Sequence, residues 1–472
     1  MNYQTVIGLE IHAELLTLSK VFCSCSAEFG GEENVRVCPR CSGMPGSLPL
    51  FGRGAAELAV KAGLALNCKI NNFSAFDRKN YFYPDLPKAY QITQFFSPIC
   101  SDGYVEISNK RVRINRIHIE EDAGKLIHDE KQKISLADYN RCGIPLIEIV
   151  TEPDIRSAEE AKEFTAAVAL ALKYAGVCDS KMEQGSLRCD VNISIMPEGS
   201  TVFGTRTEIK NLNSLRSIGR AIEYEYSRQK SLLEKGERVI QQTLHWNDST
   251  GVTKALRSKE EAHDYRYFPE PDIPPMFITD EEIENIAKTM PEMPNSRKER
   301  YLSLGLSDAD ASLLIADKDL ADFYDETIKF YGNPKSVASM IIVELLRRMN
   351  DASISAEDLK IKPENLATLC KMADDGTVSR GAAKDILKEM FEIGGTPMEI
   401  AEKGGMIMSN DSSEVETVAD EILAANPKAV EEFKGGSAKV FGFLMGQMCR
   451  KLGKSANPAI IKKVLEEKLK NI

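Results

Sequence analysis

Four cysteines follow an acid–histidine pair within the first forty-one residues, and they constrain the fold more than any other feature. The pair is Glu10 and His12. The cysteines are Cys23, Cys25, Cys38 and Cys41. Two close pairs joined by twelve turn-rich residues let four thiolates meet at one tetrahedral Zn²⁺. We therefore expect a structural zinc site, and the alternative is a group of free thiols.

The other seven cysteines are scattered singly, as is typical of small buried hydrophobic residues. They are Cys68, Cys100, Cys142, Cys178, Cys189, Cys370 and Cys449. The odd total of eleven cysteines argues against a secreted framework of paired disulfides. We expect a cytoplasmic protein.

Length and composition indicate a globular protein of several domains. At about 150 residues per domain, the 472 residues suggest about two to four domains. Hydrophobic residues make up 43% and charged residues 28% of the chain, which is ordinary for globular proteins. No apolar run approaches the ~20 residues that span a bilayer, so we expect no membrane partner.

Charge is distributed unevenly along the chain. The net charge of −11 excludes a generic polyanion binder. Residues 434–472 nevertheless contain nine Lys or Arg and two Glu, a local balance of +7. A basic tail on an acidic body suggests an anionic partner, and the alternative is a solvated helical surface.

The spacing of apolar residues changes near residue 292. Before it, short β-type runs alternate with turn residues, and three helical stretches interrupt them, which predicts an α+β fold. The strands are expected at 105–107, 112–114, 144–150 and 191–195, and the helices at 54–66, 157–175 and 212–235. A rigid extended segment follows at 269–275.

From about residue 295 onward, apolar residues recur at helical spacing with few strand signals. The predicted helices cover 295–303, 308–316, 318–331, 334–349, 355–360, 363–374, 379–392, 396–403, 412–424, 426–434, 437–450 and 457–470. Gly404-Gly405 marks a break between two helical modules. We predict three domains, 1–292, 293–404 and 405–472.

Acidic residues beside turns and strand ends carry the chemistry of the first domain. They include Glu10, the stretch 118–122, Glu148, Glu183 and Asp190. On a strand, Glu10 and His12 point to the same face. Several carboxylates and one imidazole would suit Mg²⁺, which prefers oxygen ligands and keeps waters for phosphate. For any single acid, the alternative is an ordinary surface residue.

Two further segments lie among these acids. Residues 78–88, RKNYFYPDLPK, are too aromatic for a linker and too charged for a core, and could line a polar channel or a nucleotide pocket. Residues 203–214, FGTRTEIKNLNS, offer cations and amides for phosphate oxygens. The chain contains no Walker A motif, kinase glycine-rich loop or GxSxG motif, so the usual NTPase and hydrolase hypotheses lack support.

Long stretches of the chain resemble one family, the B subunits of the tRNA-dependent aspartyl/glutamyl amidotransferases. The stretches are GLEIHAELLTLSKVFCSCS, VCPRCSGMPGSLP, RKNYFYPDLPKAYQITQ, RIHIEEDAGKLIH, DYNRCGIPLIEIVTEPDIRS, MEQGSLRCDVNISI, FGTRTEIKNLNS and DYRYFPEPDIPP. The C-terminal GGSAKVFGFLMGQMCRKLGKSANPAIIKKVLEEKL resembles the YqeY-type tRNA-binding module of the same family. The resemblance runs end to end.

The resemblance implies an ATP-dependent carbon–nitrogen ligase with glutamine as amido donor. Such a B subunit uses ATP and Mg²⁺ to phosphorylate the side-chain carboxylate of Glu on tRNA(Gln) or Asp on tRNA(Asn), and ammonia then displaces the phosphate. The ammonia comes from an amidase, the A subunit. This amidase, the B subunit, and a small C subunit would form a heterotrimer. The catalytic half is expected to resemble the glutamine synthetase fold, followed by all-α domains.

The resemblance also implies roles for particular residues. The expected Mg²⁺ ligands are Glu10, His12, Glu121, Glu148 and Asp190, with Glu120 as the second choice to Glu121 because an adjacent pair on a strand points to opposite faces. Candidates for the ammonia route or substrate contact are Lys79, Tyr81, Asp85 and Lys88, and Lys79 is counted with Glu10, His12, Glu121 and Asp190 as catalytic. Candidates for ATP phosphates are Arg206 and Lys210. Candidates for the tRNA backbone are Arg450, Lys451 and Lys454.

Two alternatives remain, and the chain departs from the family pattern at Leu244 and at Phe51-Gly52. The chain could be a zinc-stabilised RNA-binding protein without chemistry, although many inward-facing acids would repel phosphate unless a metal intervened. It could be a tRNA-independent ligase acting on free glutamate, although the basic tail argues against that. Leu244 stands where the resemblance leads us to expect a basic residue, which weakens any tRNA contact there.

Overall fold

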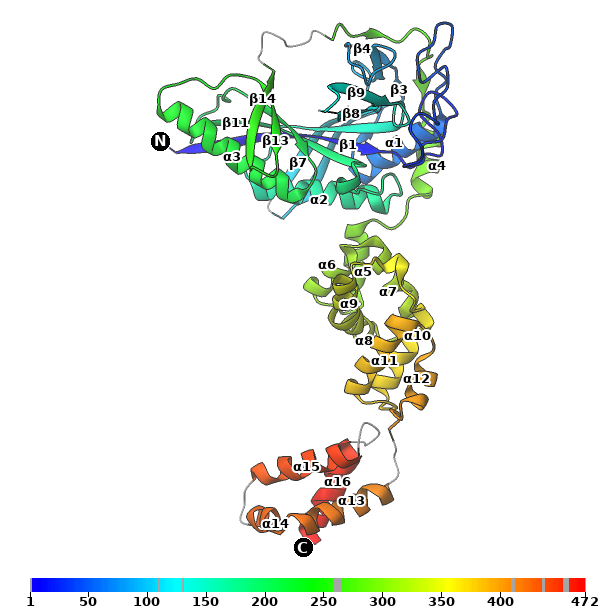
Figure 1. Ribbon diagram of the computed structural model, residues 1–472, viewed down its shortest axis with the longest axis vertical. Coiled ribbons are helices and arrows are strands. Elements are labelled where there is room, and N and C mark those ends of the chain that lie inside the picture. The colour runs from blue at the N-terminus through cyan, green and yellow to red at the C-terminus, as the bar shows by residue number, and fades with distance from the viewer. Residues whose placement is uncertain are drawn as a thin grey trace. The chain divides into compact units, whose positions relative to one another are not determined.

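Strand β1 (Tyr3–Glu14) lies inside a nine-stranded sheet of the first unit, Met1–Pro294, in this computed structural model (Figure 1). The described residues are 2–108, 110–129, 131–257, 265–408, 412–434, 438–452 and 458–471. The strand order is β14 (Val252–Arg257), β13 (Thr243–Asn247), β12 (Thr207–Leu212), β11 (Leu187–Pro197), β1, β10 (Pro145–Thr151), β7 (Lys110–Glu121), β6 (Cys100–Ile107) and β2 (Lys69–Ile70). Neighbours pair antiparallel except β12 and β13.

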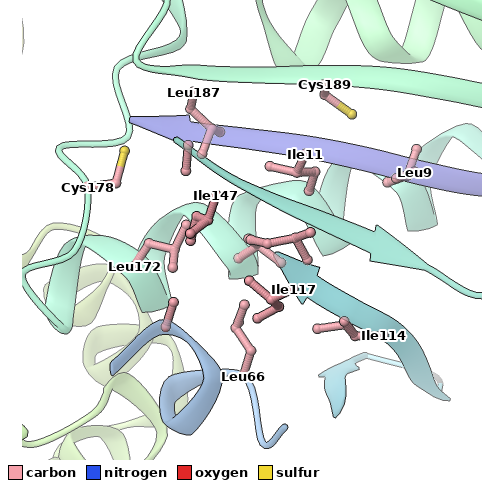
Figure 2. Packing of buried hydrophobic residues seen from close by; sticks show 14 of the residues in the cluster. Leu9, Ile11, Leu66, Ile114, Ile117, Ile147, Leu172, Cys178, Leu187 and Cys189 are labelled. Atoms are coloured by element: carbon pink, nitrogen blue, oxygen red, sulfur yellow. The ribbon is translucent and has the colours of Figure 1, made fainter. Parts of the chain in front are cut away.

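Apolar residues at alternate positions give this sheet one core face. On β1, Leu9, Ile11 and Ala13 are buried. They pack, together with Ile117 of β7 and Ile147 of β10, toward the helices on that side (Figure 2). Those helices are α1 (Arg53–Ala65), α2 (Ala158–Tyr174) and α3 (Leu215–Glu234). The other face of the sheet is therefore free to carry polar side chains.

Serine caps fix the start of two of these helices. The side chain of Ser157 accepts a hydrogen bond from the backbone N–H of Glu160 at the start of α2, and Ser214 accepts from Ser217 at the start of α3. Each cap satisfies a backbone N–H that has no partner inside the helix. The three expected helices are confirmed to within about three residues, whereas the strands expected at 105–107 and 112–114 are parts of the longer strands β6 and β7.

Small sheets surround the large one. They are β15 (Phe268–Pro269), β4 (Asp77–Asn80) and β5 (Tyr90–Thr93); β16 (Met276–Phe277) and β3 (Phe73–Ser74); and β8 (Lys125–Asp129) and β9 (Ile134–Asp138). A short 3-10 turn covers Met182–Gln184. Helix α4 (Asp280–Lys288) was not expected, although Thr279 and Glu282 form a capping box that is readable in the sequence.

The second unit, Asn295–Ile472, is helical throughout its regular structure among the described residues. Its helices are α5 (Pro294–Ser303), α6 (Asp308–Ile315), α7 (Lys318–Phe330), α8 (Pro334–Ser339), α9 (Leu346–Ala352), α10 (Pro363–Asp374), α11 (Arg380–Ile393), α12 (Pro397–Lys403), α13 (Ser412–Ala425), α14 (Pro427–Lys434), α15 (Ala438–Leu452) and α16 (Pro458–Asn471). A π-helical turn, Met340–Leu345, joins α8 to α9, and a 3-10 turn covers Ala356–Asp358. The single helix expected at 334–349 is thus helical but irregular.

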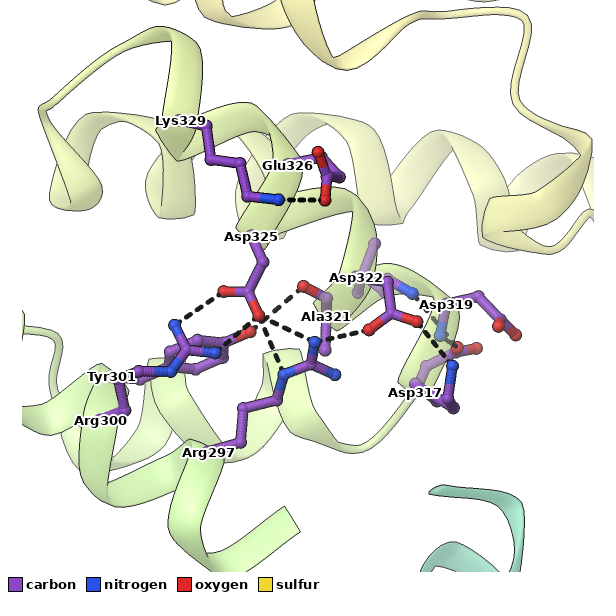
Figure 3. A network of polar contacts seen from close by, with 12 residues as sticks. Arg297, Arg300, Tyr301, Asp317, Asp319, Ala321, Asp322, Asp325, Glu326 and Lys329 are labelled. Atoms are coloured by element: carbon purple, nitrogen blue, oxygen red, sulfur yellow. Dashed lines mark hydrogen bonds and ion pairs between the residues drawn. The ribbon is translucent and has the colours of Figure 1, made fainter. Parts of the chain in front are cut away.

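Two hydrophobic clusters lie in this unit, one between Tyr301 and Ala401 and one between Val415 and Leu469. The predicted boundary at 404/405 falls between them and stays a prediction. In the part of the unit that holds the first cluster, Arg297 and Arg300 of α5 form ion pairs with Asp325 of α7, and the Arg300–Asp325 distance is 2.6 Å (Figure 3). This ionic network ties α5 to α7.

Candidate metal centres and active site

The strand register brings polar side chains of four strands to one face of the large sheet. His12 on β1 pairs with Glu148 on β10 and with Arg188 on β11. Glu148 in turn pairs with His118 on β7, and Glu10 pairs with Asp190 on β11. Directly opposed residues of antiparallel strands project to the same face, so side chains from distant parts of the chain become neighbours.

His12, Glu120 and Glu148 form the first group of candidate metal ligands. One ligand atom from each lies within 4.8 Å of the other two. The Nε2 atom of His12 is 3.5 Å from Oε1 of Glu120 and 3.5 Å from Oε2 of Glu148. Nε2 of His118 lies 3.2 Å from the same Glu148 oxygen. Two carboxylates and an imidazole fit a divalent cation with oxygen and nitrogen ligands.

The electrostatics of this group are those of a buried cation–anion cluster. Burial opposes the charged imidazole of His12, but Glu148 and Glu120 outweigh it and raise the pKa of His12 to about 9. Burial alone would raise the pKa of Glu148, but His118 and His12 hold that pKa well below its usual range. The carboxylate of Glu148 is therefore ionised, and a metal ion bound here would have to displace the proton of His12, because only a neutral imidazole is a metal ligand.

Glu10, Asp190 and Glu208 form a second group, with ligand atoms again within 4.8 Å of one another. Burial and the nearby Glu148 raise the pKa of Glu10. Nζ of Lys210 lies 3.1 Å from Asp190 and 2.9 Å from Glu208. Burial opposes the charge of Lys210, but these carboxylates outweigh it and raise its pKa. Lys210, expected to contact ATP phosphates, is thus the counter-ion of this group.

Glu121, the acid preferred from the sequence, does not lie in either group of the described residues. Strand alternation sends Glu121 to the opposite side of β7. There it accepts a hydrogen bond from the backbone N–H of Ile92 at 3.0 Å and forms an ion pair with Lys88. Both charged side chains are buried. Glu120, the second choice, lies with His12 and Glu148.

The four clustered cysteines come together as their spacing predicts. Their sulfur atoms lie within 4.8 Å of one another. The second pair sits on a tight turn in which the N–H of Ser42 donates to Cys38 O and the N–H of Gly43 to Arg40 O. A hydrogen bond from Cys23 lowers the pKa of Cys41 to about 4, against the effect of burial. Four soft sulfur ligands in this arrangement fit zinc.

Lys79 lies near the group of His12, Glu120 and Glu148, and its ammonium is close to two tyrosine rings. Its Nζ is 5.0 Å from the ring centre of Tyr265 and 5.8 Å from that of Tyr81. Burial disfavours the charged ammonium, but Glu120 and Tyr267 outweigh it and raise the pKa of Lys79. A cation is therefore held next to the carboxylate cluster.

The remaining predicted residues are more scattered. Arg206 is exposed, and burial raises the pKa of Asp85. Arg450 is exposed on α15, Lys451 pairs with Glu421, and Lys454 lies outside the described residues. Leu244 is buried in the core on β13, so it offers no tRNA contact.

Sequence reasoning missed Glu208 as a member of the second group and His118 as a partner of Glu148. A signal existed for both. Ile117 and Ile119 occupy the core face of β7, so His118 and Glu120 must share the other. Glu208 and Lys210 alternate with buried Thr207 and Ile209 on β12 in the same way.

Comparison with known proteins places the chain in a family. The family described as "GatB/GatE catalytic domain" matches residues 5–284, and "GatB domain" matches residues 322–469. The chain is 53% identical to the B subunit of the aspartyl/glutamyl-tRNA(Asn/Gln) amidotransferase of Ruminiclostridium cellulolyticum, over 100% of this chain and 98% of the relative. The proteins of the same name from Caldicellulosiruptor saccharolyticus, covering 100% of both chains, and Carboxydothermus hydrogenoformans, covering 99% of both, are 50% and 48% identical.

These matches extend over nearly the full length of both partners. A protein with two groups of paired acids on a sheet face, and with this end-to-end similarity, is an amidotransferase component. The chain belongs to the family of aspartyl/glutamyl-tRNA(Asn/Gln) amidotransferase B subunits. Among its described residues, no helix is both long and apolar enough to cross a membrane.

Proposed function

We propose that this chain activates the side-chain carboxylate of Glu on tRNA(Gln), or of Asp on tRNA(Asn), by ATP-dependent phosphorylation and then amidates it with ammonia released from glutamine. The observation that carries the proposal is that two clusters of candidate metal ligands lie side by side. One contains Glu10 and the other His12, which project from the same face of β1. Phosphoryl transfer depends on charge neutralisation and positioning more than on covalent help.

Mg²⁺ fits both groups. His12, Glu120 and Glu148 would hold one ion, and Glu10, Asp190 and Glu208 a second. Bound Mg²⁺ supplies neutralisation of phosphate charge. Asn192 donates to Glu10 at 2.9 Å and keeps that carboxylate turned into the site. Lys79 presents a cation to the same space, where it can orient a carboxylate or phosphate oxygen.

The cysteine group is proposed to hold a structural Zn²⁺. A structural zinc ion would cross-link the two loops that carry the cysteines and would take no part in the reaction. The turn that it would fix lies next to a small cavity of about 90 Å³ lined by Cys23, Cys41, Lys88 and Glu121. We include Lys88 in the proposed route for ammonia because it lines this cavity.

Partners follow from the same proposal. The relatives are named as B subunits, and we propose that an amidase A subunit, together with a small C subunit, completes the enzyme. The helical residues 293–404 and 405–472 are proposed as two domains, the last of which binds tRNA, with Arg450, Lys451 and Lys454 at the phosphate backbone. Similarity of the catalytic unit to the glutamine synthetase fold is part of this proposal, because both would form a γ-glutamyl phosphate.

ATP hydrolysis by the assembled complex tests the function. Hydrolysis should require Glu-tRNA(Gln) or Asp-tRNA(Asn) and should fail with free glutamate. Glu10→Ala and Asp190→Ala should abolish it and leave glutaminase activity intact, whereas Glu183→Ala, at an exposed acid outside both groups, should not. Hydrolysis with free glutamate alone would indicate the tRNA-independent ligase, and tRNA binding without any hydrolysis would indicate the RNA-binding alternative.

A further inference from the structure

Two adjacent phenylalanines stand exposed directly after β5. Phe95 is 42% and Phe96 62% exposed. Phe95 stacks on Tyr267, with ring centres 4.1 Å apart and planes at 12°, and Phe96 meets Phe95 edge-on at 5.1 Å. The buried carboxylate of Asp77 accepts hydrogen bonds from both phenylalanine N–H groups, at 2.8 and 3.0 Å. These three rings, the aromatic platform, are therefore held in place.

The aromatic platform lies against the polar half of β7. Oε1 of Gln94 accepts a hydrogen bond from the N–H of Ile119 at 2.9 Å. The guanidinium of Arg116 is 6.0 Å from the Phe95 ring centre. Across the described ranges, the buried Nε of Arg116 has no hydrogen-bond partner. An open aromatic surface thus adjoins a half-buried cation.

Charge changes sign along β7 at this point. The first part of the strand carries Lys110, Arg111, Arg113 and Arg116, and the end carries Glu120 and Glu121. Arg111 and Arg113 pair with Glu106 and Asp154. At about 3.3 Å per residue, Arg116 and Glu120 are separated by about 13 Å along the strand. The aromatic platform therefore stands a short distance from the candidate metal ligands, on their basic side.

We propose that the aromatic platform binds the unpaired terminal base of the acylated tRNA, with the base stacked on Phe96 and Arg116 at an adjoining phosphate. This inference rests on the proposed function and names the subsite that would present the aminoacyl group to the metal groups. Splayed bases of single-stranded RNA stack on exposed aromatic side chains. The adenine of ATP would instead be expected in a cleft that covers most of its surface.

Fluorescence of a modified tRNA tests the proposal in the assembled complex. The probe is full-length tRNA(Gln) with 2-aminopurine in place of its terminal adenosine. Stacking on Phe96 should quench this base when the complex binds. Phe96→Leu keeps an apolar side chain but removes the ring, so it should abolish the quenching and weaken tRNA binding about 5- to 150-fold. Arg116→Gln should weaken tRNA binding and lower its salt dependence.

The matched control is Phe277→Leu, which removes another exposed phenylalanine, from the small sheet β16–β3. It should change neither quenching nor affinity. A fluorescent ATP analogue is titrated in parallel. If Phe96→Leu weakens ATP binding and not tRNA binding, the ring serves the nucleotide and the proposal is overturned; unchanged quenching and affinity overturn it as well. If the unaltered complex binds no tRNA at all, the proposed function itself fails.

Discussion

The ammonium of Lys20 lies 3.8 Å from the sulfur of Cys41, although Lys20 is only 1% exposed. The same nitrogen donates hydrogen bonds to the backbone oxygens of Arg36 at 2.8 Å and Tyr139 at 3.0 Å. Lys20 thus links the cysteine loop to the turn after β9 and places its ammonium beside the sulfur of Cys41, the cysteine whose pKa is lowered. A buried charge is tolerated here because its hydrogen bonds are satisfied.

Replacing Lys20 with Met should destabilise the first unit. The change removes the donor to the Arg36 oxygen, at about 1–3 kcal/mol, whereas the Tyr139 oxygen still accepts a hydrogen bond from the N–H of Cys142 at 3.1 Å. Trp246, the only tryptophan, is fully buried in this unit and reports its unfolding in urea. Lys61→Met is the control, since Lys61 forms an i,i+4 pair with Glu57, worth about 0.5 kcal/mol or less. Equal losses in the two variants would contradict a special role for Lys20.

Elemental analysis should find about one zinc per purified chain. Cys38→Ser should remove it, because three thiolates and a hydroxyl bind zinc poorly. Cys449→Ser, at a half-buried cysteine of α15, should retain it. Full zinc content in Cys38→Ser would reject the four-thiolate site.

Glu120→Gln should impair metal binding and activity, whereas Glu121→Gln should impair stability. The first should weaken Mn²⁺ binding, followed by electron paramagnetic resonance, and reduce tRNA-dependent ATP hydrolysis, with little change in stability. The second leaves Lys88 buried without its partner and should lower the free energy of unfolding by about 3–5 kcal/mol. Loss of Mn²⁺ affinity in Glu121→Gln alone would restore the original assignment.

Deletion of residues 405–472 should weaken tRNA binding strongly and flatten its dependence on salt, because phosphate contacts release counter-ions. Arg450→Gln alone should reduce the slope of log K against log [salt] by about 0.7–0.9 for each phosphate that this arginine neutralises. Circular dichroism spectra in the far and near ultraviolet check that the remaining chain stays folded. An unchanged slope in the truncated complex would mean that these cations only keep a helical surface soluble.

Local patterns in the sequence predicted much of this architecture, because alternation and helical spacing are local properties. Glu10 and His12 share a face for that reason, and the cysteine spacing placed four sulfurs together. Glu120, and not the preferred Glu121, lies beside His12, and the buried Ile117 and Ile119 on the other face of β7 follow an alternation that is visible in the sequence. The stacking of Phe95 on Tyr267 had no local signal, since it joins segments that are distant in the chain.

The two groups of acids are spaced by the peptide backbone itself. Glu10 and His12 are two residues apart on β1, a separation of about 7 Å. No loop intervenes between them, so insertions and deletions elsewhere in the chain leave this interval untouched. The geometry of β1 therefore sets the distance between the two proposed cations, and a β-bulge between Glu10 and His12 would change that distance.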